Sequence, residues 1–302
     1  MFKFGRNIVL VMASASAISS LIFGCDTTQV TPPQAAAPSL SWAEVLEQNP
    51  DPQIVTDADF RARMIATGLP WRVRDRGTNI EMLLVPPGTF MMGKSAGDTE
   101  AYSDEGPAHQ VTLTQGFYLG RTEVTQAQWQ ANEQANGQVK SGRNPSYFAG
   151  YSDSPARPVE QVSWNMIQQF CTQNGLRLPT EAEWEYACRG GNLDPRYGVP
   201  NDIAWSSRNS ESATHAVGGK LPNALGFYDT IGNVWEWCAD YYGPYTAVDV
   251  TNPTGATSGA CRVLRGGSWA YIFSFNCRVS RRYVGTADFF YVGFGFRVAR
   301  TP

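Results

Sequence analysis

Basic and imidazole side chains are scarce in this chain of 302 residues, and each scarcity excludes a class of function. Lys and Arg number 24 against 27 acidic residues, giving a net charge of −3, and they form no basic stripe of the kind that binds nucleic acid. The two histidines, His109 and His215, stand far apart in unrelated loops, so they favour no shared metal centre. With 42% hydrophobic residues, the chain is long enough for a substantial core, in one large domain or two small ones.

Two segments near the C-terminus lack Lys, Glu, Gln, Met, Trp and Pro altogether. These segments, 270–276 and 283–294, are called the aromatic runs below. Their eight aromatic residues are Tyr271, Phe273, Phe275, Tyr283, Phe289, Phe290, Tyr291 and Phe294. The aromatics follow neither the period of a strand nor that of a helix. Core packing is one explanation, but not all of them can face inward, so we expect an exposed apolar patch suited to adaptable binding.

Residues 1–24 have the pattern of a bacterial lipoprotein signal peptide. Two basic residues precede an apolar stretch that ends at Cys25 and resembles a lipobox. We expect Cys25 to be lipidated, which would anchor an exported lipoprotein at the bacterial cell surface or in the periplasm. An ordinary secretory signal or a short membrane anchor is the alternative. Residues 25–40 are rich in Pro, Ala and Thr, and we predict that they form a flexible tether.

The rest of the chain predicts short elements and long loops, as its 29 Gly and 19 Pro also indicate. Residues 41–70 are predicted as a short helical N-terminal segment, with helices capped by Ser41 and Thr56 and covering 41–48 and 56–67. The main domain is expected over 71–302. Within it we expect strands in 80–92, 111–119 and 295–298, and helices beginning near Thr125, Ser163 and Thr180.

Five motifs in this main domain match one family closely: P-V-E-Q-V-S-W (158–164), R-L-P-T-E-A-E-W-E-Y-A-C-R-G-G (177–191), G-N-V-W-E-W-C-A-D (232–240), R-V-L-R-G-G-S-W (262–269) and G-F-R-V-A-R (295–300). They resemble the formylglycine-generating enzyme, or sulfatase-modifying factor, family. The resemblance covers the chain from about residue 77 to its end. It implies an α+β fold of the C-type-lectin-like kind, with much irregular loop structure.

Enzymes of this family oxidise a substrate cysteine to formylglycine with a copper ion held by two cysteines, ligands that suit soft Cu(I). Tyr271 stands at the first of these positions, and the second falls near Asn276 or Cys277. The resemblance therefore implies that copper is not bound and that the chain does not catalyse this reaction. A related branch uses iron held by a His-x3-His-x-Glu set, which this sequence lacks. A copper-dependent formylglycine-generating enzyme, or a related oxidase acting on an exported sulfatase, remains the alternative.

The same resemblance implies a calcium ion in the turn before residue 237. Its ligands would be the backbone carbonyls of Ile231, Gly232 and Val234 and the carboxylate of Glu236, since calcium prefers oxygen ligands. In the alternative interpretation Glu236 only hydrogen-bonds the backbone of a rigid turn.

Beyond Cys25 the chain has five cysteines, so at least one is free or paired outside the chain. The family resemblance pairs Cys188 with Cys277 in a disulfide and leaves Cys171 free and buried. A bond between Cys238 and Cys261 stays open, because connectivity does not follow from sequence.

A second resemblance concerns the segment 265–297. Every residue type in the aromatic runs can arise when the first two bases of an Asn codon ending in C are randomised. This resembles the variable region of diversity-generating retroelement target proteins, which display mutated residues on a C-type-lectin-like scaffold. We therefore predict a non-catalytic, surface-displayed protein that binds a protein or cell-surface ligand; an ordinary family member with fixed residues is the alternative. The predicted site consists of Tyr271, Phe273, Phe275, Tyr283, Phe289, Phe290 and Tyr291.

Overall fold

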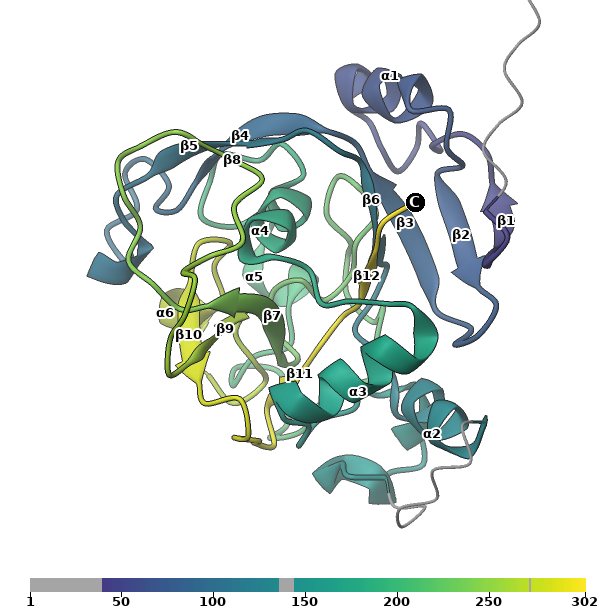
Figure 1. The fold of residues 1–302 in the computed structure, drawn as a ribbon. Helices are drawn as coiled ribbons and strands as arrows, with labels where there is room; N and C mark the ends of the chain where they lie inside the picture. The colour runs from purple at the N-terminus through teal and green to yellow at the C-terminus, as the bar shows by residue number, and fades with distance from the viewer. Residues whose placement is uncertain (1–39, 136–143, 272) are drawn as a thin grey trace, which may run out of the picture. The chain divides into compact units, whose positions relative to one another are not determined.

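The first described strand of the chain opens a five-stranded antiparallel sheet with the order β1-β2-β3-β6-β12 (Figure 1). The computed structural model describes residues 40–135, 144–271 and 273–302. The strands of this sheet are β1 (Ala43–Glu47), β2 (Arg72–Asp75), β3 (Glu81–Val85), β6 (Phe117–Gly120) and β12 (Ala299–Arg300). Because β12 pairs with β6, the C-terminal end of the chain is held by the N-terminal half of the fold.

Two smaller sheets complete the strand structure of the described residues. They have the orders β10-β9-β7-β11 and β4-β5-β8. Their strands are β4 (Gly88–Met92), β5 (His109–Leu113), β7 (Trp235–Tyr241), β8 (Val250–Thr251), β9 (Arg262–Arg265), β10 (Arg282–Gly285) and β11 (Phe294–Gly295). In the four-stranded sheet β11 runs parallel to β7, with Phe294 opposite Trp235. This sheet therefore holds both ends of the segment 265–297.

The helices are short, and their ends follow local capping rules. They are α1 (Ala58–Ala66), α2 (Gln126–Ala135), α3 (Trp164–Asn174), α4 (Glu181–Arg189), α5 (Pro200–Ile203), α6 (Phe273–Asn276), and the 3-10 helices η1 (Ser103–Glu105), η2 (Tyr147–Gly150) and η3 (Ser154–Ala156). Ser163 caps α3 by accepting from the Met166 N–H, and Thr180 with Glu183 forms a capping box at α4, so both predicted starts are confirmed. Over the described residues, none of these helices has the length and apolar character needed to cross a bilayer.

Three predicted elements differ from the structure. The segment 41–48 is the strand β1 and not a helix, because it pairs with β2 and buries Ala43 against the sheet. The next helix does form, but Asp57 is its N-cap in place of Thr56. The segment 295–298 is not a half-buried strand: β11 ends at Gly295, and the three residues that follow are completely buried.

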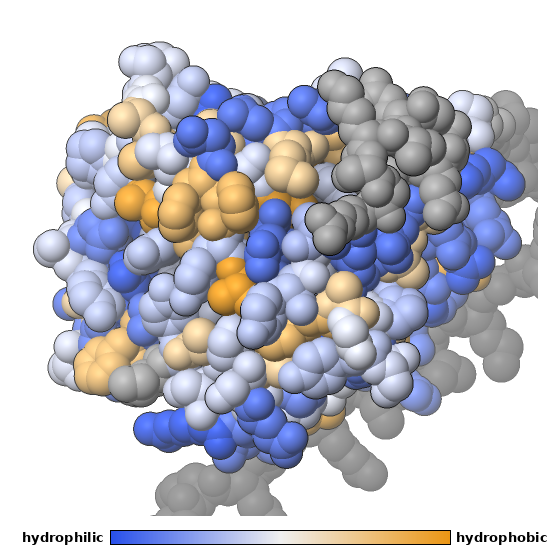
Figure 2. Space-filling view, turned by 90° about the horizontal axis from the view of Figure 1, so that it is seen from below, coloured by the Kyte–Doolittle hydropathy of each residue, from blue (hydrophilic) through white to orange (hydrophobic). Residues whose placement is uncertain are grey.

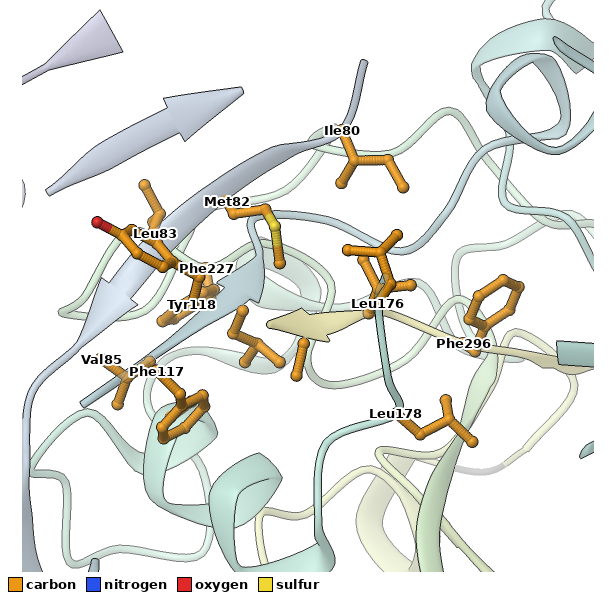
Figure 3. Packing of buried hydrophobic residues seen from close by; sticks show 14 of the residues in the cluster. Ile80, Met82, Leu83, Val85, Phe117, Tyr118, Leu176, Leu178, Phe227 and Phe296 are labelled. Carbon is orange, nitrogen blue, oxygen red and sulfur yellow. The ribbon is translucent and has the colours of Figure 1, made fainter. Parts of the chain in front are cut away.

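The main core lies between the five-stranded sheet and the segments that cover it. Figure 3 shows side chains from β3 and β6 packed with residues from loops and from the C-terminal stretch. The labelled residues are Ile80, Met82, Leu83, Val85, Phe117, Tyr118, Leu176, Leu178, Phe227 and Phe296. A second buried cluster gathers around Trp184 and includes Cys188, Cys238 and Cys277. Burial of these large side chains is the main stabilising contribution to a loop-rich fold.

Candidate functional site

Four buried arginines mark the ends of the two aromatic runs. Arg265 and Arg278 flank the run 270–276, and Arg282 and Arg297 flank the run 283–294. Each of these arginines is at most 1% exposed. A buried guanidinium requires a carboxylate partner and a full set of hydrogen bonds, so the partners of these four side chains define where the runs begin and end.

The arginines of the first run reach carboxylates that lie far back in the chain. Arg278 donates from Nη1 to Glu105 at 2.6 Å and to Asp98 at 2.9 Å. Arg265 is paired with Glu185 of α4, and both side chains are completely buried. The two ends of the first run are therefore attached to separate parts of the framework, one to the η1 region and the other to α4.

The second run is attached in the same way. Arg282 donates to Glu181 from Nε at 2.6 Å and from Nη2 at 2.8 Å. Arg297 makes an equivalent pair of bonds to Glu236, at 2.6 and 2.7 Å, and Trp184 Nε1 donates to the same carboxylate at 2.7 Å. Two parallel bonds between a guanidinium and a carboxylate fix direction as well as distance. The ends of this run are therefore held in one orientation.

Two glycines allow the chain to turn sharply into the first run. Gly266 and Gly267 have φ values of 95° and 84°, which L side chains rarely adopt. A Cβ at Gly266 would lie 2.9 Å from the Thr230 carbonyl oxygen, and one at Gly267 would lie 2.8 Å from the Asn276 carbonyl oxygen. The Gly-Gly pair is therefore part of the framework.

The aromatic residues of the runs divide into exposed, half-buried and buried groups. Phe275, Phe289, Phe290 and Tyr291 have 47%, 48%, 56% and 42% of their surface exposed. Tyr271 and Tyr283 are half-buried, whereas Phe294 is 1% exposed and belongs to the core. The side chain of Phe273, the remaining predicted site residue, lies outside the described part of the structure.

Phe294 forms the base on which several of these rings rest. Its ring centroid lies 5.8 Å from Phe289, 5.5 Å from Tyr291 and 5.9 Å from Tyr283. Beneath it, Trp237 packs edge-on at 5.7 Å. These contacts give the exposed rings a rigid base, because each rests on a side chain that is itself packed in the core.

Tyr271 connects the first run to the second. Its ring lies 5.8 Å from Trp235 and 6.5 Å from Tyr283. Burial, together with the neighbouring Tyr283 and Tyr291, raises the pKa of Tyr271 to about 12, so its hydroxyl stays protonated at neutral pH. The structure thus brings Tyr271, Tyr283, Phe289 and Tyr291 together. For Phe275 and Phe290 no ring contact is found among the described residues, and both project into solvent.

Backbone hydrogen bonds fix the loop that carries the most exposed rings. The N–H groups of Asn165 and Gln161, near the start of α3, donate to the carbonyls of Ala287 and Tyr291 at 3.0 and 3.2 Å. Trp269 Nε1 donates to the Val292 carbonyl at 3.2 Å, which ties the first run to the second. We call the surface made by Tyr271, Phe275, Tyr283, Phe289, Phe290 and Tyr291 the aromatic face.

The loop between β10 and β11 lies below β10, at the lower left of the molecule in Figure 1. The view from below in Figure 2 shows apolar side chains in several patches among hydrophilic ones. Three cavities of about 560, 370 and 220 Å³ lie in the described parts of the chain, and none is lined by a residue of the aromatic face. The aromatic face is therefore a surface patch, which favours a large partner over a small enclosed substrate.

Sequence reasoning missed an aromatic extension of this surface. Tyr147 and Tyr151 are 71% and 48% exposed, and both pack on Phe148, at 5.2 and 5.7 Å between ring centroids. Phe148 in turn packs edge-on against Trp269 at 5.5 Å. Three aromatics within the eight residues 144–151, in a loop-like stretch, were the available signal.

The described cysteines do not form the predicted disulfide. All five described cysteines are free, so the predicted bond between Cys188 and Cys277 is wrong. The Cys188 thiol faces the Thr230 carbonyl oxygen at 3.9 Å, whereas the Cys277 sulfur lies against Gly267. Burial raises the pKa of each of these thiols to about 12, so both are protonated at neutral pH.

Glu236 has a structural role that needs no ion. It is completely buried, and its two oxygens accept bonds from Arg297 and Trp184. No group of three or more His, Cys, Asp or Glu side chains in the described residues is arranged to hold a metal. The carboxylate therefore has partners without an ion, but they are the side chains of Arg297 and Trp184 and not the turn backbone that the alternative interpretation expected. Calcium held by Ile231, Gly232, Val234 and Glu236 stays a prediction.

Two solved structures have a similar fold. Treponema denticola variable protein 1 superposes with a TM-score of 0.65 and is 31% identical, over 74% of this chain and 95% of the other. PvdO from Pseudomonas aeruginosa gives a TM-score of 0.66 at 26% identity, over 76% of this chain and 98% of the other. The predicted α+β, C-type-lectin-like fold is confirmed.

Sequence comparison gives the family. The formylglycine-generating enzyme of Streptomyces coelicolor is 31% identical over an alignment of 286 positions, which covers 75% of this chain and 90% of the relative. The enzyme of Mus musculus is 31% identical over 72% of this chain and 74% of its own length. Residues 68–302 match the model of the sulfatase-modifying factor enzyme 1-like domain. This chain therefore belongs to the formylglycine-generating enzyme, or sulfatase-modifying factor, family.

Proposed function

We propose that this protein is a non-catalytic binding protein that presents the aromatic face to a protein or cell-surface ligand. The observation that carries the proposal is the exposure of Phe275, Phe289, Phe290 and Tyr291 on runs whose ends are fixed by buried arginine–carboxylate pairs. Large rings held rigid lose little conformational entropy on binding, and such residues commonly dominate the binding energy of an interface.

The absence of thiolate chemistry at the corresponding positions supports a non-catalytic role. Tyr271 stands at the first copper-ligand position, and its hydroxyl is a poor ligand for a soft ion. Cys277, near the second position, is completely buried in the cluster around Trp184. With one ligand replaced and the other withdrawn from the surface, the described residues offer no pair of thiolates.

Display at a membrane surface follows from the sequence of the N-terminal segment. Residues 1–39 lie outside the described structure, so lipidation at Cys25 and a tether over 25–40 rest on the sequence pattern. A lipid at Cys25 together with that tether would hold the domain at the membrane and leave the aromatic face free to meet a partner. We include both in the proposal.

We further propose that the residues of the aromatic runs are diversified. The residue types of the runs fit randomised Asn codons, and the similarity to Treponema denticola variable protein 1 supports the same interpretation. The fold suits this role, because the four arginines that flank the runs contact framework residues and not the aromatic side chains that would vary.

The nucleotide sequence tests this interpretation directly. Codons for 270–276 and 283–294 are expected to end mostly in C, and a near-copy of the segment with adenine at the substituted positions should lie close to a reverse transcriptase gene. Deep sequencing of a population should place the substitutions in the aromatic runs and leave the codons for Arg265, Arg278, Arg282 and Arg297 unchanged. A genome without template copy and reverse transcriptase would contradict diversification, while binding by a fixed aromatic face would remain.

Formylglycine formation is the second candidate, because relatives of this chain with 31% identity are named as formylglycine-generating enzymes. Purified protein loaded with copper is expected to leave the cysteine of a sulfatase-type peptide unmodified. Mass spectrometry for the aldehyde product checks this, with a copper-loaded enzyme of the family as positive control. Turnover above the metal-free background would overturn the non-catalytic proposal.

A further inference from the structure

A cavity of about 220 Å³ lies away from the aromatic face, at the end of β7. Its lining includes Asp240 and Tyr241 from β7, Glu181 from the start of α4, and Arg282 from β10. The next residue of β10, Tyr283, belongs to the aromatic face. Successive side chains of a strand point to opposite sides, so the cavity and the aromatic face lie on opposite sides of β10.

Among the buried acids of the described structure, Asp240 combines two properties: it has no salt bridge, and it lines a cavity. The buried carboxylates without a salt bridge in these residues are Glu123, Glu160, Asp229 and Asp240. Of these four, only Asp240 lines one of the three cavities. A buried negative charge is costly without a partner, and here a partner can enter from outside.

The neighbours of Asp240 leave one of its oxygens unused. Oδ2 accepts from the Glu181 N–H at 2.8 Å, whereas Oδ1 accepts no hydrogen bond from any described residue. The nearby Arg282 is already bound through Nε and Nη2 to the carboxylate of Glu181, so its charge is balanced. Arg262, the other cation near Asp240, lies over the Tyr241 ring and forms no ion pair with a described carboxylate, so it offsets part of the charge of Asp240 but leaves Oδ1 without a hydrogen bond.

The remaining walls suit an organic cation. Tyr241, Tyr245 and His109 contribute aromatic rings, and Met92 and Val250 contribute apolar surface. The rings of Tyr245 and His109 pack together at 4.9 Å, which holds this wall in place. Guanidinium groups already lie over two of these rings, Arg262 over Tyr241 at 3.4 Å and Arg282 over Tyr245 at 3.9 Å. An ammonium group would therefore be held mainly by charge-assisted hydrogen bonds to the free carboxylate oxygen.

We propose that this cavity binds a small primary alkylammonium group, whose N–H donors reach the free oxygen of Asp240 while its alkyl chain contacts the apolar wall. The site takes the end of a lysine side chain or a free alkylamine, which share this chemistry. It is separate from the aromatic face and does not depend on the function proposed for that face.

Binding of the cation is coupled to ionisation of Asp240. Burial and the neighbouring carboxylate of Glu181 raise the pKa of Asp240 to about 7. Since only the ionised form attracts an ammonium, affinity should be about tenfold lower at pH 6 than at pH 8. The other charged or titratable groups around Asp240 are Glu181, Glu183, Arg262, Arg282, Cys238, His109, Tyr241 and Tyr245.

The test is a titration of the full chain with n-butylammonium chloride, followed by calorimetry or protein NMR, with n-butanol as the uncharged probe of similar shape. We expect saturable binding of n-butylammonium, at least tenfold tighter than that of n-butanol at pH 8, and the tenfold weakening at pH 6. Equal binding of the two probes, or no saturable binding of n-butylammonium, would overturn the proposal. A lysine side chain and a free amine are then separated by comparing Nα-acetyl-lysine amide with n-butylammonium.

Variants locate the site. Asp240→Asn keeps the shape of the side chain and should lower the affinity for n-butylammonium at least tenfold. Asp229→Asn is the matched control, since it neutralises another unpaired buried carboxylate that lines none of the cavities, and its affinity should equal that of the unaltered protein. His109→Gln should retain the dependence on pH, because Asp240 is the group that titrates. Unchanged affinity in Asp240→Asn would contradict the proposal, and the pH dependence of the unaltered protein decides the question if this variant does not fold.

Discussion

In the segment 265–297 four arginines are buried and four aromatic side chains are exposed, which is the reverse of the usual distribution. Four arginines are at most 1% exposed, while four of the aromatic rings are 42% to 56% exposed. Charged side chains are rarely buried unless paired, and large aromatic side chains are usually inside. The difference shows that in this segment the arginines specify the fold and the aromatic residues are available for binding.

The largest loss of stability is expected when one of the four buried arginine–carboxylate pairs is broken. Arg278→Met leaves Glu105 and Asp98 buried without their cation, and it should lower the free energy of unfolding by about 3–5 kcal/mol. Urea denaturation measures this. Arg281→Met is the control, because this arginine of the same segment lies 3.8 Å from its carboxylate and should cost about 1 kcal/mol or less. A similar loss in both variants would contradict the claim that the buried ion pairs of Arg278 stabilise the fold more than the looser pair of Arg281.

Removing the charge of Glu236 tests an anchor and the calcium prediction together. Glu236→Gln keeps the shape but leaves Arg297 without a counter-ion, so a loss of about 3 kcal/mol is expected. Thermal unfolding should be followed with calcium and with a chelator. A calcium ion at this turn would stabilise the unaltered protein alone, by mass action. Melting temperatures that do not respond to the chelator would contradict calcium and leave the ion-pair prediction standing.

The turn into the first run should tolerate substitution less than other turns of the same backbone conformation. Gly267→Ala forces a Cβ against the Asn276 carbonyl oxygen and the Cys277 sulfur, and should cost about 2–3 kcal/mol. Gly97→Ala is matched, since Gly97 also has a positive φ but no atom within 4 Å of an added Cβ; about 1 kcal/mol is expected. Chemical denaturation of both variants gives the difference, and equal losses would contradict close packing at Gly267.

The smallest effect on stability is expected on the aromatic face. Phe290→Ala removes a ring that is 56% exposed and should change the free energy of unfolding by less than about 0.5 kcal/mol. The same change should weaken ligand binding by about 1–4 kcal/mol once a ligand is known. Phe294→Ala, in the same run but 1% exposed, should cost about 3–5 kcal/mol of stability. A large loss of stability in Phe290→Ala would show that this ring belongs to the core.

Local chemistry made part of the fold predictable. Ser163, Thr180 and Glu183 cap helices through their own side chains, so their roles follow from neighbouring residues alone. The strand β1 was not predictable in this way, because the short segment A-E-V-L-E carries no strong strand pattern and becomes a strand by pairing with β2. Pairing across the fold overrides local preference in such segments.

The sequence predicted which segment carries the aromatic face, but not how deeply each ring is buried. The run Phe289-Phe290-Tyr291 indicated exposure because three adjacent rings cannot all point inward, and all three are exposed. That Tyr283 is half-buried depends on its packing on Trp235, which no spacing in the run reveals. The buried arginines were missed for a similar reason, since a guanidinium is buried only where a distant carboxylate meets it, and Glu105 lies 173 residues from Arg278.

These distances in sequence have a consequence for how the protein matures. Glu105, Glu181 and Glu236 obtain their cations only when the last 40 or so residues are made and docked. Contacts between such distant residues form late and slowly. A chain truncated before Arg297 would leave the Glu236 carboxylate without its cation and would be more prone to unfolding and degradation. An ordered aromatic face is therefore expected only in chains whose N-terminal and C-terminal parts have docked, because the same ion pairs hold both.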